Sequence, residues 1–466
     1  MDPDAKPVLD LVADAAPGYL ASLADRPAGD PAAQALLDDL AGPLPEEGLG
    51  ATGSVAQLLR IGTGAATHSA GPRFFHLVTG GVTPAALAAD WITSLLDQNA
   101  VLWTSSPLAT TAETVVLGWL RDLFGLPAAW GGVLTPSATF ANLTGLACAR
   151  HWWATAHGRD VAADGLGGLP AMPVLGGGYV HPSARKALQI LGCGRDTVRV
   201  HGPGRADVDA LDRSLAALSE PAVLVATAGE VNAGDFDPID EMAELAGRYG
   251  CWLHVDGAFG LFAAVSPRTA HLLRGVDRAD SVAADGHKWL NVPYESGFAF
   301  VRDPAVLSDT FGSWHAPYLA GGEVDYSRLG PESSRRARAL PIWATLRSYG
   351  RAGHRELVER HLDLAAHLGR LVDAAPDLEL LAPVRLCVVC FRYAPPGVPE
   401  ADLDALNQAV GDALIADGRV YAGTTVYEGR TALRPAIVNW RTTEADVELL
   451  VSVVRELGVR FVQDAG

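Results

Sequence analysis

The chain has 466 residues, of which 49% are hydrophobic and 19% charged, a balance typical of a globular protein. This length suits a large domain accompanied by smaller ones. The formal net charge of −18 argues against nucleic acids and anionic membrane surfaces as partners.

The five cysteines are few, odd in number and scattered, which favours a reducing, cytoplasmic setting. Cys387 and Cys390 have the spacing of a redox motif, but they lie in a β-branched run, where residues three apart point to opposite faces. We therefore expect neither a metal site nor a redox role. Residues 1–7 are polar and acidic and predict no signal peptide. No apolar run reaches the roughly 18 residues of a membrane span.

Residues 1 to about 70 are expected to be helical, because alanine- and leucine-rich segments such as 32–40 alternate with proline and glycine breaks. This arm contains no residues that indicate chemistry of its own.

A glycine- and hydroxyl-rich turn over residues 131–139 leads into a helical run over 140–154. Such a turn offers free backbone N–H groups and the positive end of the helix dipole to an anion. An ordinary capped helix is the alternative interpretation.

A βαβ unit follows. Residues 222–226 form a strand, Asp237 is the expected N-cap of a helix, and Pro238 its first residue. Gly250 ends that helix, and the next strand ends at Asp256. The two strands should be parallel, with a right-handed crossover.

Asp256 and Lys288 each follow a short apolar run of strand length. Ligands of open α/β sheets bind at the carboxyl ends of the strands. A buried acid and a buried lysine suit pyridoxal phosphate, since the lysine forms a Schiff base and the acid keeps the ring nitrogen protonated. The alternatives are a surface lysine and a structural acid that caps a helix or pairs with an arginine.

Residues 318–336 are rich in Gly, Ser and Arg and predict a long loop, anchored where Arg335 and Arg336 close it. The remaining pattern predicts a small α+β domain made of a charged helix over 354–375, strands near 386–393, a helix over 400–417 and apolar runs near 419–422 and 432–439.

We therefore divide the chain into an N-terminal helical arm over 1–85, a large cofactor-binding domain over 86–350 and a small C-terminal α+β domain over 351–466. The fold class is α/β, with a mainly parallel sheet in the large domain.

Two segments carry a family resemblance: His254-Val255-Asp256-Gly257-Ala258 and Asp285-Gly286-His287-Lys288-Trp289-Leu290. They resemble signatures of the group II pyridoxal-dependent decarboxylases, which include aromatic amino acid and glutamate decarboxylases. The similarity runs from about Gly71 to about Arg441. It implies the fold-type I architecture, related to aspartate aminotransferase, and a homodimer across which the N-terminal arm packs.

The resemblance also implies an activity. An L-amino acid would be decarboxylated to its amine through a Schiff base at Lys288 and a quinonoid intermediate. Asp256 would hold the pyridine nitrogen, Ala258 would lie under the ring, and His181 would stack on its other face and contact the substrate or move a proton.

By the same resemblance, Ser137, Ala138 and Thr139 match the phosphate positions, and His287 flanks them. The sequence departs from the family at Pro136, which has no N–H, and at Phe140. A polar residue should bond the phenolic oxygen of the cofactor. Glu230 suits that role poorly because two anionic oxygens would compete, so Asn232 is our candidate.

Tyr318 aligns with a loop tyrosine that protonates the substrate carbon in aromatic amino acid decarboxylases, with Tyr326 as a rival. Phenylalanine occupies that position in aldehyde-forming relatives. Thr79 matches a substrate-side threonine.

Three other functions remain open at this stage. The same fold supports aldehyde synthesis, transamination or another carbon–carbon cleavage. A paralogue could bind the cofactor without turnover, although the set Asp256, His181 and Lys288 argues against it. A nicotinamide enzyme is disfavoured because no Gly-x-Gly-x-x-Gly motif opens the first βα turn.

Overall fold

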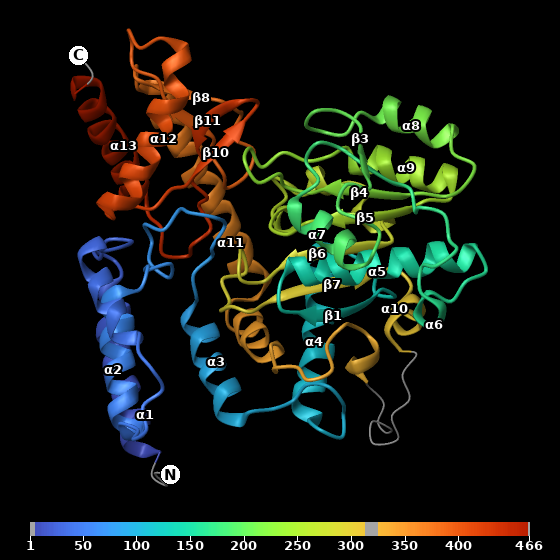
Figure 1. The fold of residues 1–466 in the computed structure, drawn as a ribbon, viewed down its shortest axis with the longest axis horizontal. Helices are drawn as coiled ribbons and strands as arrows, with labels where there is room; N and C mark the ends of the chain where they lie inside the picture. The colour runs from blue at the N-terminus through green and yellow to red at the C-terminus, as the bar shows by residue number, and fades with distance from the viewer. Residues whose placement is uncertain (1–4, 313–324, 465–466) are drawn as a thin grey trace. The chain divides into compact units, whose positions relative to one another are not determined.

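The computed structural model describes residues 5–312 and 325–464. The chain divides into two compact units (Figure 1). The central unit is Val82–Leu362, and the terminal unit combines the residues up to Gly81 with those from Asp363 onward.

Within the described residues, the central unit contains a seven-stranded sheet with the order β1-β7-β6-β5-β4-β2-β3 (Figure 1). Neighbouring strands from β3 to β6 are parallel, whereas β7 runs antiparallel to both β6 and β1. The mainly parallel sheet expected from the sequence is therefore confirmed. The strands are β1 (Gly131–Thr135), β2 (Val174–Gly176), β3 (Val198–Val200), β4 (Val223–Thr227), β5 (Trp252–Asp256), β6 (Ser281–Asp285) and β7 (Gly297–Val301).

Helices cover both faces of this sheet, as fully buried parallel strands require. Helix α5 (Ala138–Ala156) packs against β5, β6 and β7 and against α7 (Pro182–Ile190). Helix α9 (Ile239–Tyr249) packs on β4 and β5 and contacts α8 (Val208–Ala216). Right-handed crossovers place α9 on the face opposite α7, because β4→β5 and β2→β3 step across the sheet in opposite directions.

The central unit contains further helices and 3₁₀ turns. They are α3 (Pro84–Leu96), α4 (Pro107–Phe124), α6 (Val161–Asp164), α10 (Pro304–Phe311) and the 3₁₀ turns η2 (Gly260–Val265), η3 (Ala270–Leu273), η4 (Val276–Arg278) and η6 (Tyr326–Arg328).

The predicted βαβ unit is present, but its helix begins one residue later than expected. Pro238 is the N-cap of α9, with no side-chain capping bond. The Asp237 carboxylate instead accepts the backbone N–H groups of Thr227 at 2.7 Å and Ala206 at 2.8 Å. Burial raises the pKa of Asp237 to about 6. Gly250 ends the helix in the left-handed conformation, as predicted.

The charged helix predicted over 354–375 is the second half of a longer one. Helix α11 (Ala339–Ala374) contains Gly350 at φ 59° and ψ −177°, where two helical segments meet. The sequence analysis missed the first segment because it assigned residues up to 336 to a loop and read no helix directly after it.

The terminal unit contains α1 (Lys6–Ser22), η1 (Pro31–Leu40), α2 (Gly50–Ala65), α12 (Glu400–Asp417) and α13 (Glu444–Asp464). Its sheet has the order β10-β11-β9-β8, with antiparallel neighbours. The strands are β8 (Leu378–Leu380), β9 (Phe391–Tyr393), β10 (Thr424–Tyr427) and β11 (Arg430–Leu433). A core that includes Phe391, Leu414 and Val454 joins this sheet to its helices.

The helix predicted over 400–417 is confirmed residue for residue. The strand predicted near 386–393 is shorter than expected, since only residues 391–393 are in a strand. Cys387 and Cys390 are both buried as free thiols, and burial raises the pKa of Cys387. Among the described helices, none has the length and apolar character needed to cross a membrane.

Candidate active site

Polar residues gather at the carboxyl edge of the parallel strands. Asp256 is the last residue of β5, and Asp285 is the last residue of β6. Thr227 ends β4 directly opposite Asp256 in the ladder, so these two side chains share a face of the sheet.

Lys288 lies three residues beyond β6. Its side chain is 21% exposed, and its Nζ is 3.0 Å from Asp285 Oδ2. His287 Nε2 lies 3.5 Å from the same oxygen. Trp289 is fully buried and donates its indole N–H to His361 at 2.9 Å. This anchored segment differs from the alternative of an ordinary surface lysine, and Asp285 pairs with Lys288.

Asp256 is 3% exposed. Its Oδ2 accepts a hydrogen bond from Asn142 Nδ2 at 2.8 Å, and its Oδ1 accepts the Ala258 N–H at 3.2 Å. Both donors are neutral, and Asp256 forms no ion pair with a lysine or arginine in the described residues. A buried carboxylate is costly without a cation. The protonated pyridine nitrogen of pyridoxal phosphate fits this site.

The predicted phosphate turn caps α5. Ser137 is the N-cap residue but makes no side-chain capping bond, and it and Thr139 are partly exposed. The Ala138 N–H donates to Asp285 Oδ1. Gly297 packs so closely that a Cβ there would lie 2.8 Å from Ser137 Cα. Ser137 and Thr139 are therefore the groups of this turn that suit a phosphate, while the Ala138 N–H orients Asp285.

The turn after β4 is braced by Glu230. Its carboxylate accepts bonds from Asn232 Nδ2 and from the Ala233 N–H, each at 2.7 Å. The amide of Asn232 is thus engaged within the turn. The hydroxyl of Thr227 is buried and has no hydrogen-bond partner in the described part of the chain. This orphaned group next to Asp256 also fits a polar cofactor. The sequence analysis missed it, although it is the first polar residue after the apolar run 222–226.

His181 is the N-cap residue of α7, and its Nδ1 accepts the Ser183 N–H at 3.2 Å. Its ring is exposed. Asn142, which the sequence analysis did not single out, is fully buried and also bonds His254 and Ser183. The sequence feature that could have identified Asn142 is its polar amide in the first turns of an otherwise apolar helix.

Three candidates remain. Thr79 is buried in the terminal unit. Tyr318 lies outside the described residues. Tyr326 is 3% exposed, its hydroxyl is 3.0 Å from Thr114 Oγ1, and burial raises its pKa.

Arg335 anchors the end of the predicted loop. Its guanidinium bonds Glu113 at 2.7 Å and lies 5.1 Å from the centre of the Tyr326 ring. Both charged side chains are 1% exposed. Glu113 also accepts the Leu134 N–H at 2.9 Å, so this pair braces the end of β1 just before the phosphate turn.

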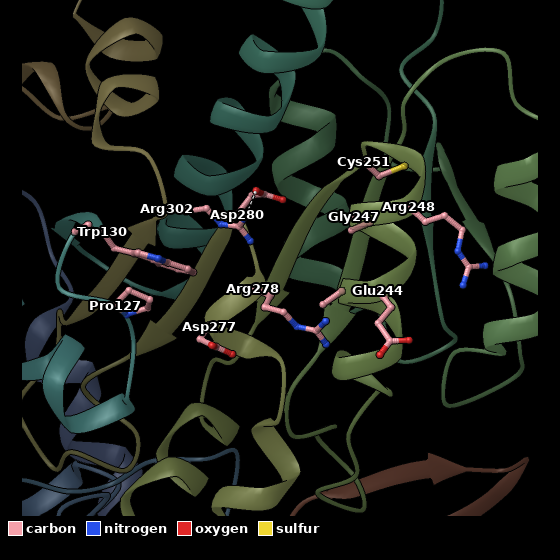
Figure 2. Close-up of a pocket in the computed structure, with 13 residues that line it drawn as sticks. Pro127, Trp130, Glu244, Gly247, Arg248, Cys251, Asp277, Arg278, Asp280 and Arg302 are labelled. Carbon is pink, nitrogen blue, oxygen red and sulfur yellow. Dashed lines mark ion pairs between the residues drawn. The ribbon is translucent and has the colours of Figure 1, made fainter.

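A separate pocket of about 850 Å³ opens at the opposite, amino edge of the sheet (Figure 2). Its lining includes Trp130, Arg278, Asp280 and Arg302, and Arg302 pairs with Asp280 at 3.5 Å. None of the predicted cofactor residues lines it. The described residues contain no cluster of three or more His, Cys, Asp or Glu side chains suited to a metal ion.

The pyridoxal-dependent decarboxylase conserved domain matches residues 51–394 of this chain. The chain belongs to the pyridoxal-dependent decarboxylase family. It is a fold-type I enzyme and a carboxy-lyase, with pyridoxal phosphate as its cofactor, as the sequence predicted.

Relatives of this decarboxylase have several specificities. Tryptophan decarboxylase 1 of Oryza sativa subsp. japonica is 30% identical over 401 residues, covering 80% of this chain and 77% of the relative. The aromatic-L-amino-acid decarboxylase of Bacillus atrophaeus is 28% identical, with coverages of 84% and 82%. Phenylacetaldehyde synthase from a Rosa hybrid cultivar is 29% identical, with coverages of 84% and 81%.

Solved structures agree with this assignment. The crystal structure of Oryza sativa TDC with PLP and tryptamine superposes with a TM-score of 0.90, at 26% identity and 99% coverage of both chains. Mouse CSAD gives a TM-score of 0.88, at 26% identity and 97% coverage of both chains.

Proposed function

We propose that this protein decarboxylates an L-amino acid to the corresponding amine and carbon dioxide, with pyridoxal phosphate held covalently by Lys288. The observation that carries the proposal is Asp256, a buried carboxylate with only neutral donors, on the strand next to the one that leads to Lys288. The bound cofactor supplies an electron sink for the bond that breaks.

The residues divide the work. Lys288 would provide the amine that holds the cofactor, and Asp285, 3.0 Å from Lys288 Nζ, would fix the position of that amine. Asp256 would accept a hydrogen bond from the protonated ring nitrogen and so favour the charged ring. Ser137 and Thr139, at the N-terminus of α5, would bind the phosphate.

The substrate class is supported by the relatives, whose names include aromatic amino acid, acidic amino acid and L-2,4-diaminobutyrate decarboxylases.

An amine-release screen of the pyridoxal phosphate-loaded protein over the common L-amino acids tests the proposal. We expect equal amounts of amine and carbon dioxide from at least one of them. A loaded protein that releases no amine from any, or that releases only a keto acid, would contradict decarboxylation.

A second candidate function is aldehyde synthesis, which is favoured by the similarity to phenylacetaldehyde synthase. The two outcomes differ in whether a proton or oxygen reaches the substrate carbon. Oxygen would give aldehyde, ammonia and hydrogen peroxide along with carbon dioxide. Tyr318 is the expected proton donor, since Tyr326 is buried against α4 with its hydroxyl bonded to Thr114.

Tyr318→Phe should therefore slow amine formation, since general-acid help is typically worth ~10²–10⁴-fold in rate. Aldehyde and peroxide should appear in place of the amine. Tyr326→Phe is the matched control and should leave the product ratio unchanged. The reverse pattern would assign the acid to Tyr326.

We also propose a homodimer. Helix α1 buries none of its residues, and α3 exposes a cluster of large apolar side chains, made of Trp91, Ile92, Leu95 and Leu96. Exposed apolar clusters of this kind mark protein interfaces. Light scattering should give twice the chain mass at micromolar concentration, whereas an active monomer would refute the dimer.

A further inference from the structure

A chain of hydrogen bonds runs through the interior of the central unit to the active-site edge. Every member of the chain from Trp252 to Asp256 is buried. The successive bonds are Trp252 Nε1 to Ser281 Oγ at 2.9 Å, Ser281 Oγ to His254 Nδ1 at 2.8 Å, His254 Nε2 to Asn142 Oδ1 at 2.8 Å and Asn142 Nδ2 to Asp256 Oδ2 at 2.8 Å.

The direction of each bond follows from its ends. The Asp256 carboxylate can only accept, so Asn142 turns its amide N–H toward Asp256 and its carbonyl oxygen toward His254 Nε2. Nε2 of His254 must therefore carry the one proton of the neutral imidazole and donate it to that oxygen. Nδ1 of His254 then accepts from the Ser281 hydroxyl, which in turn accepts the Trp252 indole N–H. Burial lowers the pKa of His254 to about 4, which keeps this ring neutral near pH 7.

A second arm leaves the same amide. Asn142 Nδ2 also donates to Ser183 Oγ at 3.2 Å, and Ser183 Oγ lies 2.7 Å from His181 Nδ1. The backbone N–H of Ser183 donates to that nitrogen as well. Since a backbone N–H can only donate, Nδ1 of His181 is an acceptor. The neutral His181 ring therefore carries its proton on Nε2.

We propose that Asn142 is a positioning residue for the reaction, linking the acid and the imidazole of the active site through one amide group. It holds the Asp256 carboxylate in place with one N–H and, through the hydroxyl of Ser183, supports the position of the His181 ring with the other. The inference rests on the proposed function, in which Asp256 faces the cofactor, and on the stacking role that the family resemblance implies for His181.

An asparagine meets this need in a way that similar residues do not. Aspartate has nearly the same shape but no N–H groups, so it would set one carboxylate against another at Asp256. Alanine would leave the Nε2 proton of His254 and one oxygen of Asp256 without partners. Asn142 is therefore a determinant of the site rather than a spacer in α5.

A double-mutant cycle with Asn142→Ala and Asp256→Asn in the loaded enzyme tests the link. Removing a hydrogen-bond partner that orients a metal ligand typically costs roughly 10–100-fold, and we take the same scale for a partner that orients Asp256. We expect Asn142→Ala to lower kcat by that factor, with little change in KM. In the Asp256→Asn background the same change should cost less than about threefold, because residues that act through one another are not additive. Full additivity would overturn the proposal.

Two further variants distinguish a loss of the hydrogen bonds of Asn142 from a general loss of folding. Asn142→Asp conserves shape and should lower kcat in the same way, and normal kcat in this variant would refute the role of the N–H groups. Asn407→Ala is the matched control, since Asn407 is a fully buried asparagine that bonds the backbone of Tyr393 in the terminal unit. It should leave kcat per bound cofactor unchanged, whereas a loss equal to that of Asn142→Ala would make both effects structural.

Titration of the apoprotein with pyridoxal phosphate gives a readout that does not depend on turnover. Asn142→Ala should weaken cofactor binding, and Asn407→Ala should not. If the wild-type protein binds the cofactor but releases no amine, the proposed function fails while this readout still decides the role of Asn142. If amine is released but Asn142→Ala binds the cofactor normally and its kcat loss is additive with that of Asp256→Asn, only the present inference fails.

Discussion

The two edges of the seven-stranded sheet both present charged residues, but in different ways. At the amino edge, the arginines of the pocket are paired with carboxylates, and Arg302 and Asp280 have side chains that are 45% and 22% exposed (Figure 2). At the carboxyl edge, Asp256 is almost fully buried and has only neutral donors.

This difference distinguishes ordinary ion pairs near the surface from a candidate active site. Exposed ion pairs contribute little to stability and need no function to explain them. A desolvated carboxylate without a cation is costly, and such groups occur where a ligand or a reaction uses them. The size of the pocket at the amino edge is therefore a weaker indicator of function than the surroundings of one acid.

The largest expected effect lies at Lys288. Lys288→Ala should abolish covalent retention of the cofactor and lower turnover by roughly 10³-fold or more, because the amine that holds the cofactor is gone. Borohydride reduction followed by peptide mass spectrometry checks this in the wild type. Lys186→Ala is the control, since Lys186 is an exposed lysine on α7. A cofactor adduct on another lysine would show that Lys288 does not hold the cofactor and that the active site is not at the carboxyl edge.

We expect the buried pair of Glu113 and Arg335 to contribute to the stability of the fold and not to the reaction. Arg335→Met leaves Glu113 charged and unpaired in the interior, which typically costs roughly 3–5 kcal/mol of unfolding free energy. The double variant with Glu113→Leu should recover most of that loss. Denaturant unfolding measures both, and a double variant no more stable than the single one would assign the effect to lost packing instead.

Asp256→Asn and Asp280→Asn compare the two edges directly, since the first residue ends β5 and the second precedes β6. Asp256→Asn should retain some cofactor and lose turnover by roughly 10²-fold, the lower end of acid–base effects, because the ring nitrogen is no longer held protonated. Asp280→Asn should leave turnover within about twofold. If both variants lower the turnover rate equally in a steady-state assay, the two edges do not differ in function.

The sequence predicted the fold and the positions of Asp256 and Lys288 because both follow from local patterns. Short apolar runs that end in Asp256 and precede Lys288 place these residues at one sheet edge without knowledge of packing. Local signals also predicted that Gly250 ends a helix and that residues 400–417 form one.

What the sequence did not reveal depends on contacts between distant segments. Asp237 was predicted to cap a helix, but its carboxylate is taken by Ala206, 31 residues earlier, and by Thr227. Asn142 reaches Asp256 across 114 residues, and no local pattern indicates that contact. The hydrogen bond from the amide of Asn232, the candidate for the phenolic oxygen, to the carboxylate of Glu230 was likewise not evident from the sequence.

The smallest expected effect is a pH dependence whose sign differs between His254, in the interior of β5, and Asp280, at the amino edge. Burial lowers the pKa of His254 to about 4, so the folded protein binds fewer protons at this site than the unfolded chain between pH 6.5 and pH 4. Its contribution to stability is complete above pH 6.5 and is lost as the pH falls toward 4, by at most about 3 kcal/mol.

Asp280 has the opposite sign, because burial raises its pKa and the folded state then retains the proton. Protonating Asp280 as the pH falls therefore favours folding, so it cannot cause a loss of stability in acid. Denaturant unfolding of wild type and His254→Gln at pH 7 and pH 4.5 measures the difference. We expect His254→Gln to be less stable at pH 7 but to lose less stability on acidification, whereas His271→Gln, at an exposed position, should follow the wild type. An unchanged pH slope in His254→Gln would mean that another buried base, such as His354, whose pKa burial also lowers to about 4, dominates the acid response.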